Sequence, residues 1–140
     1  MLPLKRASLV LIGVAVGFAI LALTGWGAAR WDGLNAFYRE LGSLTPGQAD
    51  VWVVATRKAL HVVLYAALVV VLARWALAGR PHAVREAVLL VGLVALADEG
   101  LQLITPHRTA RWTDLLVDAA GMAVGAWMAS KVRRREGRAT

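Results

Sequence analysis

The 140-residue sequence contains no cysteine and few charged residues. The absence of cysteine excludes a disulfide framework, a thiolate zinc site and a cysteine nucleophile. Charged residues make up only 18% of the chain, whereas hydrophobic residues make up 59% and the mean hydropathy is +0.59. Soluble proteins are about 45–50% apolar, so this composition excludes disorder and argues against a soluble core. The length fits one domain, residues 1–140.

Four apolar segments are long enough to cross a membrane, which takes about 20 residues at 1.5 Å each. The first extends from Ala7 to Ala29 without a charged residue. The others extend from about 56 to 77, 84 to 104 and 113 to 132. A soluble helical bundle is the alternative, but these segments are apolar around the whole helix and not along one stripe. We therefore predict an all-α integral membrane bundle of four transmembrane helices.

The first apolar segment has a second interpretation, as a cleaved signal peptide with Lys5 and Arg6 as its charged region. Its apolar stretch is longer than the usual 7–15 residues, and no clear small-x-small cleavage site precedes Arg30. A retained first transmembrane helix is therefore the preferred prediction.

The distribution of charge predicts on which side of the membrane the ends of the chain lie. With four spans, ten basic residues are on the side of the two termini and six are on the other side. Basic residues accumulate on the cytoplasmic side, so we predict cytoplasmic termini, an extracytoplasmic loop over 26–55 and a basic cytoplasmic tail over 131–140. The excess positive charge then lies beside anionic lipid, and we expect no nucleic-acid partner.

The predicted outer loop contains two local helix signals. The segment 33–42, GLNAFYRELG, predicts a short interfacial helix with Phe37 and Leu41 on one face. Thr45 followed by Pro46 is typical of a helix N-cap and first helical position. We therefore expect the second long helix to begin before the membrane.

Two glycine pairs predict close packing of helices. Gly13 and Gly17 are four residues apart in the first span, and Gly121 and Gly125 are four apart in the fourth. Small residues at this spacing let helix backbones approach closely in lipid, and we interpret both pairs as packing sites within the chain. The short connections between the last three spans predict that these helices pack consecutively.

Ionisable residues inside membrane spans are costly and indicate function by default, and here they gather at one depth. Lys58, His61 and Tyr65 share one face of the second span at spacing i, i+3, i+7. Asp98 lies eight residues before Pro106, which is about 12 Å along a helix. The remaining polar residues at this depth or just outside it are Glu99, Gln102, His107, Arg108, Arg111, Asp114 and Asp118. We predict that they converge in a polar pocket that opens outward.

The order and spacing of these residues resemble the VanZ-like family over about residues 55–130. The matching motifs are Lys58-x-x-His61-x-x-x-Tyr65, Asp98-Glu99-x-x-Gln102, Arg108-x-x-x-x-x-Asp114 and Asp118-x-x-Gly121-x-x-x-Gly125. Asp118 stands where the family usually has asparagine, and Pro106-His107-Arg108 replaces the commoner Pro-Gly-Arg. The resemblance implies a small multi-pass protein of the bacterial cell membrane. The namesake of the family is associated with low-level resistance to the glycopeptide teicoplanin.

The cluster suggests an enzyme that acts on a lipid-linked or cell-wall substrate at the outer leaflet. The candidate catalytic residues are His61, Asp98, Glu99, Asp114 and Asp118. The candidate substrate-binding residues are Lys58, Tyr65, Gln102, Arg108 and Arg111. In this interpretation His61, beside Asp98 or Glu99, is the general acid and base. The cations hold a phosphate or carboxylate, for which arginine offers a bidentate fork.

The same residues are also compatible with functions that involve no catalytic turnover. The cluster can bind a membrane lipid headgroup or a glycopeptide without turnover, or its ion pairs can simply join three helices. Proton-coupled transport is disfavoured because the inner half of the spans has no comparable polar path. We expect no cofactor. His61, Asp98, Glu99 and Asp118 offer ligands for a divalent metal, although their spacing matches no recognised metal motif. The sequence does not indicate an oligomeric state.

Overall fold

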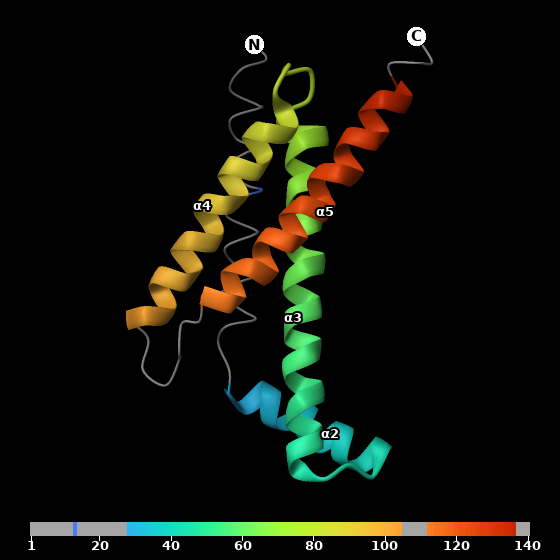
Figure 1. The fold of residues 1–140 in the computed structure, drawn as a ribbon, viewed down its shortest axis with the longest axis vertical. Coiled ribbons are helices and arrows are strands. Elements are labelled where there is room, and N and C mark those ends of the chain that lie inside the picture. The colour runs from blue at the N-terminus through green and yellow to red at the C-terminus, as the bar shows by residue number, and fades with distance from the viewer. Residues whose placement is uncertain (1–12, 14–27, 105–111, 137–140) are drawn as a thin grey trace.

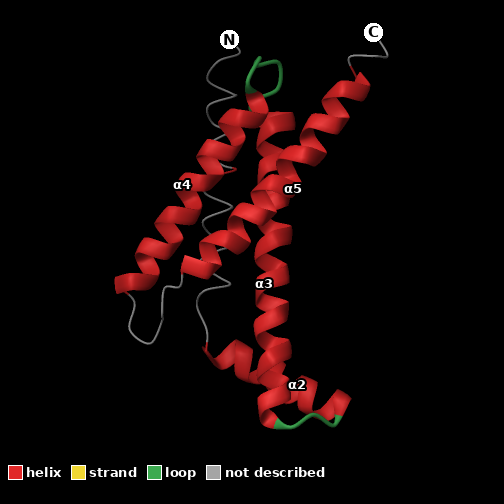
Figure 2. Cartoon of the chain, viewed as in Figure 1, coloured by secondary structure: helices red, strands yellow, loops and turns green. Residues whose placement is uncertain are grey.

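A computed structural model of the chain describes residues 13, 28–104 and 112–136. Their elements, in chain order, are α2 (Ala28–Gly42), α3 (Pro46–Val71), a π-helical turn η1 (Leu72–Ala76), α4 (Ala83–Ile104) and α5 (Trp112–Glu136) (Figure 1). Within these ranges the chain forms helices joined by loops and no strand, which confirms the all-α prediction there (Figure 2). Most of the first apolar segment, 7–29, lies outside the described residues.

Among the described residues, two helices are long and apolar enough to cross a membrane, namely Pro46–Ala76, which comprises α3 and η1, and Trp112–Val132 of α5. The first has 31 residues, about 46 Å at 1.5 Å each, which exceeds a hydrocarbon layer of about 30 Å. α4 has 22 residues, about 33 Å. The bounds of α4 and α5 agree with the predicted spans at their N-terminal ends to within one residue, whereas α2 begins five residues before the predicted interfacial helix.

The start of α3 is fixed by a capping box. The Gln48 backbone N–H donates to Thr45 Oγ1 over 3.4 Å, and the Thr45 backbone N–H donates to Gln48 Oε1 over 3.0 Å. The first backbone N–H groups of a helix have no acceptor within the helix. The two hydrogen bonds of the capping box supply acceptors for the N–H of Gln48, in the first turn, and for the N–H of Thr45, the N-cap residue. The prediction that Thr45 and Pro46 begin a helix is confirmed. α3 therefore extends beyond the ends of α4 and α5 towards α2 (Figure 1).

α2 packs across this N-terminal extension of α3. The hydroxyl of Tyr38 is 2.7 Å from Thr56 Oγ1, and the Arg57 guanidinium lies over the Trp31 ring, 5.2 Å from its centroid. Phe37, on the predicted apolar face of α2, is exposed. The polar and aromatic side of α2 thus holds it to α3 at Thr56 and Arg57, directly before Lys58.

α5 crosses α3 with the two backbones in close approach (Figure 1). A Cβ built on Gly121 would lie 2.7 Å from the Val62 carbonyl oxygen, and one built on Gly125 would lie 2.5 Å from that of Ala66. This confirms that the fourth-span glycines are packing sites within the chain. The helices α3, α4 and α5 all contact one another, but the largest contact joins α3 to α5. Consecutive packing is thus only part of the arrangement, because the glycines let α5 come closest to α3.

The core between the three helices is made largely of small side chains. Ala87, Val91 and Ala95 line one face of α4 and are fully buried. They pack with Tyr65 and Val69 of α3 in the same cluster. This packing aligns the C-terminal end of α4 with the N-terminal end of α5, beside the middle of α3 (Figure 1).

Of the two glycines predicted to pack the first span, Gly13 and Gly17, the structure describes Gly13. A Cβ on Gly13 would lie 3.0 Å from Leu72 Cδ2 of η1, so Gly13 lies against the C-terminal end of the α3 segment. Gly17 lies outside the described residues.

Candidate functional site

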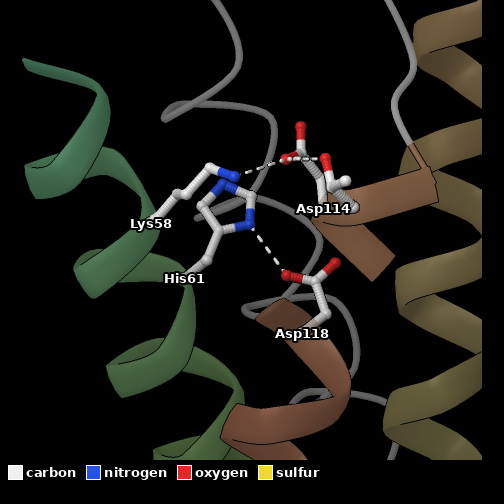
Figure 3. A network of polar contacts seen from close by, with 5 residues as sticks. Lys58, His61, Asp114 and Asp118 are labelled. Atoms are coloured by element: carbon white, nitrogen blue, oxygen red, sulfur yellow. Dashed lines mark hydrogen bonds and ion pairs between the residues drawn. The ribbon is translucent and has the colours of Figure 1, made fainter. Parts of the chain in front are cut away.

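The ionisable residues of α3 and α5 face each other where the two helices meet. Lys58 and His61 lie one turn apart on α3, and Asp114 and Asp118 lie one turn apart at the start of α5. Figure 3 shows both α3 side chains pointing toward the two carboxylates. The faces that the sequence predicted on separate helices are thus brought together.

His61 and Asp118 form the buried pair of this site. His61 Nδ1 is 3.0 Å from Asp118 Oδ1, and the two side chains are 18% and 2% exposed. A carboxylate with so little access to water is costly unless it is paired or hydrogen-bonded. When the Asp118 carboxylate accepts a hydrogen bond from Nδ1–H, it fixes the orientation of the imidazole ring. Nε2 is then the nitrogen that can exchange a proton with a ligand.

The partner of His61 differs from the one expected. An α4 carboxylate, Asp98 or Glu99, was expected beside His61, whereas the hydrogen bond of His61 is to Asp118 of α5. The reason is that Gly121 and Gly125 follow Asp118 on the same stripe and bring α5 against α3.

Lys58 and Asp114 form a second, more open pair. Lys58 Nζ is 3.5 Å from Asp114 Oδ1, and the side chains are 44% and 29% exposed. Both side chains are therefore accessible from outside the three packed helices. The pair is therefore better placed to meet a ligand than to hold the helices together.

Tyr65 lies one turn beyond His61, at the closed end of the cluster. Its ring centroid is 6.1 Å from that of His61. The residue is fully buried, and its hydroxyl makes no hydrogen bond to the residues that the structure describes. Val91, Val94 and Ala95 of α4 belong to the same core cluster as Tyr65, and Asp98 and Glu99 follow them on that helix. Asp98 and Glu99 are buried and each has an interaction of its own.

Several predicted site residues fall outside this description. Arg108, Arg111 and His107 lie outside the described residues, as does the side chain of Gln102, whose backbone is in the last turn of α4. Across the described ranges, no three histidine, aspartate or glutamate side chains are grouped to hold a metal ion. What the described side chains can do is move protons, through an imidazole oriented by a buried carboxylate.

The structure adds neighbours that the sequence analysis missed. Thr113 Oγ1 lies 3.5 Å from Asp114 Oδ1, within reach of a long hydrogen bond. Arg57, next to the cluster, is held over Trp31 of α2. The sequence offered a signal for the contact between Thr113 and Asp114, because the two residues are adjacent. Nothing in the residue spacing indicated the contact between Arg57 and Trp31.

Comparison with known proteins gives one family. The family model of VanZ/LLP1 matches residues 9–133, which include every residue of the cluster. No curated protein and no solved structure matches the chain significantly.

Proposed function

This chain belongs to the VanZ/LLP1 family, and we propose that it is a multi-pass bacterial cell-membrane protein that processes a lipid-linked or cell-wall substrate. The family and the two helices that are long and apolar enough to cross a membrane indicate a membrane protein. The observation that carries the proposed activity is the buried His61–Asp118 pair. The expected phenotype is altered susceptibility to teicoplanin, because the namesake of the family is associated with resistance to it.

The proposed topology has four spans and both termini in the cytoplasm. It rests on the lengths of α3, α4 and α5, on the apolar segment 7–29 and on the basic tail 131–140. Green fluorescent protein fused after Thr140 should fluoresce, because it folds in the cytoplasm. Alkaline phosphatase inserted at Ser43, in the exposed loop between α2 and α3, should be active, because that loop is extracytoplasmic. An inactive phosphatase at Ser43 together with an active one after Thr140 would reverse the topology.

In the proposed chemistry His61 acts as general acid and base. The Asp118 carboxylate holds the imidazole in one orientation through its contact with Nδ1. Asp98 and Glu99 bring two further carboxylates to the same site for proton transfer. Lys58, at the open side, meets an anionic part of the substrate, and we expect Arg108 and Arg111 to join it. The attacking group is water, a carboxylate of the cluster or a hydroxyl of the substrate, and no cofactor is required.

The His61→Ala variant tests this proposal. Purified protein is incubated with a lipid extract of its host membrane, and mass spectrometry follows the species that wild type converts. Loss of a general acid and base lowers a rate about 10²–10⁴-fold, so we expect a turnover reduced by that factor. His82→Ala is the matched control. His82 is exposed in the turn before α4, and Ala83 and Asp98 are about 22 Å apart along that helix.

The result also separates catalysis from binding. Lost turnover with retained binding of the extracted lipid in His61→Ala supports the enzyme. A wild-type protein that binds a lipid headgroup or glycopeptide and forms no product supports the non-catalytic alternative, and the enzymatic proposal is then wrong.

A further inference from the structure

Arg57 is a half-buried cation that no described carboxylate balances. Among the basic side chains that the structure describes, Arg57, Lys58 and Arg74 are half-buried. Lys58 is paired with Asp114, and Arg74 has an interaction of its own, whereas the contact of Arg57 is the Trp31 ring. All nine acidic residues of the chain lie within the described ranges. Because a partly buried charge is costly without a counter-charge, this position suits an anion from outside the chain.

The contact with Trp31 holds the guanidinium of Arg57 without using its hydrogen bonds. The guanidinium carbon lies over the ring, 5.2 Å from the ring centroid, and is attracted by the π electrons. The ring supplies no oxygen acceptor, whereas a guanidinium has five N–H donors. An arginine that stacks on an aromatic ring can therefore still bind an oxyanion through two parallel N–H bonds.

The ring itself is held in place by the packing of α2 on α3. The Tyr38 hydroxyl is 2.7 Å from Thr56 Oγ1, and Asn35 Nδ2 donates to Asp50 Oδ1 over 2.6 Å. These two contacts fix α2 across the N-terminal part of α3 (Figure 1), with Trp31 beside Arg57. A side chain that is already ordered loses less conformational entropy when a ligand binds.

Arg57 lies at the outer entrance of the cluster. It precedes His61 by four residues, so the two share one side of α3 and are about 6 Å apart along the helix. Lys58 follows it directly, and Asp114 is the carboxylate that pairs with Lys58. Two cations and one carboxylate leave an excess of positive charge here. A phosphate monoester, with a charge of about −1.5 to −2, is attracted more strongly than a carboxylate.

The depth of Arg57 suits a phosphate that is attached to a lipid. Arg57 is the second residue of the predicted second span, 56–77, and so lies at the outer edge of the hydrocarbon layer. Tryptophan side chains such as Trp31 are enriched at this level, where lipid headgroups lie. A lipid bound through its phosphate at Arg57 can keep its alkyl chain in the bilayer.

We propose that Arg57, held by Trp31, binds the phosphate of a lipid-linked ligand together with Lys58. The proposal rests on the proposed function in that this ligand is the lipid-linked substrate or its product. It goes further by naming the phosphate and by adding a residue that the sequence did not single out. Trp31 is a positioning residue in this site, because it acts on the ligand through Arg57.

Three probes test this site, namely dodecyl phosphate, dodecanoate and inorganic phosphate. Thermal unfolding of the purified full-length protein in a nonionic detergent, at increasing concentrations of each probe, gives the apparent affinity. We expect wild type to bind dodecyl phosphate most tightly. The Arg57→Gln variant should bind it about tenfold more weakly, as expected for the loss of charge-assisted hydrogen bonds. Arg57→Lys should lie between the two, because lysine keeps the charge but not the bidentate geometry.

Arg39→Gln is the matched control, since it removes the same charge from an exposed arginine of α2 and should leave the affinity unchanged. Trp31→Leu should weaken binding of dodecyl phosphate less than Arg57→Gln does, because Arg57 remains but is no longer held. A purely structural contact between Arg57 and Trp31 predicts a different pattern. Both variants would then unfold at a lower temperature without ligand and bind dodecyl phosphate as tightly as wild type.

Three results overturn parts of this site. Equal affinity of wild type and Arg57→Gln for dodecyl phosphate overturns the site itself, and so does an equal loss in Arg39→Gln, which would indicate general attraction between charges. Tighter binding of dodecanoate than of dodecyl phosphate by wild type overturns the choice of phosphate. Inorganic phosphate that binds as tightly as dodecyl phosphate rejects a lipid ligand in favour of free phosphate.

The same variants separate this site from the proposed activity. His61→Ala should bind dodecyl phosphate as wild type does, because it leaves both Arg57 and Lys58 in place. The enzyme proposal survives a failure of the phosphate site if His61→Ala still lowers turnover. Conversely, binding of dodecyl phosphate that depends on Arg57, without turnover in wild type, supports the phosphate site and rejects the enzyme.

Discussion

The Gly125→Val variant is expected to unfold about 10 °C below wild type, with a loss of about 3 kcal/mol in unfolding free energy. A Cβ at this position would lie 2.5 Å from the Ala66 carbonyl oxygen and 2.9 Å from Ala66 Cα. Both are backbone atoms of α3, so they cannot give way unless the whole helix moves. Overpacking of a close contact costs about 1–3 kcal/mol, and a backbone obstacle places this change at the upper end. Thermal unfolding of the purified protein measures the effect.

Gly92→Ala is the control for introducing a side chain into a helical glycine. A Cβ on Gly92 would meet only Met122 Sδ at 3.9 Å, an ordinary van der Waals distance. Alanine is favoured over glycine in a helix by about 1 kcal/mol, so this variant should be as stable as wild type or slightly more stable. If Gly125→Val unfolded at the same temperature as Gly92→Ala, the close approach of α5 to α3 would be wrong.

The Asp118→Ala variant is expected to lower turnover about 10²–10⁴-fold, as much as loss of the general base itself. It removes the carboxylate that lies 3.0 Å from His61 Nδ1, so the imidazole loses the hydrogen bond that holds it in one orientation. The Asp118→Asn variant should lie between Ala and wild type, because an amide oxygen still accepts a hydrogen bond from Nδ1. Asparagine is also the residue that the VanZ-like family usually has there.

Nitrogen NMR of the histidine side chains checks the cause of this loss. Wild type and Asp118→Asn should show His61 with its proton on Nδ1, and Asp118→Ala should show the proton no longer confined to that nitrogen. His82, exposed near the other end of α4, gives the reference signal in the same spectrum and should not change. Full turnover in Asp118→Ala would show that His61 does not depend on this carboxylate.

The elements of the described chain could largely be predicted, because local rules determine them. The N-cap at Thr45 follows from the hydrogen bonds that the first backbone N–H groups need. The ends of the apolar segments gave the N-terminal bounds of α4 and α5. The π turn at the end of α3 was not predicted, since nothing in the segment Leu72 to Ala76, LARWA, distinguishes a π turn from a continued α-helix.

The polar faces of the candidate site were equally accessible to prediction. Helical spacing places Lys58, His61 and Tyr65 on one face, and it places Asp114 and Asp118 on another. The structure brings these faces together (Figure 3). Residues that share a helix keep their relative positions whatever the helix packs against, so their grouping can be predicted from the sequence.

Which carboxylate meets His61 was decided only in three dimensions. Spacing along a helix contains no information on the angle at which a second helix crosses it, and the expectation from the sequence was Asp98 or Glu99 beside His61. The backbone contacts at Gly121 and Gly125 select Asp118. The same packing leaves the Tyr65 hydroxyl buried without a partner among the described residues. The sequence alone therefore determined helices, caps and polar faces, whereas tertiary packing decided the pairs, because contacts between helices depend on their crossing and separation.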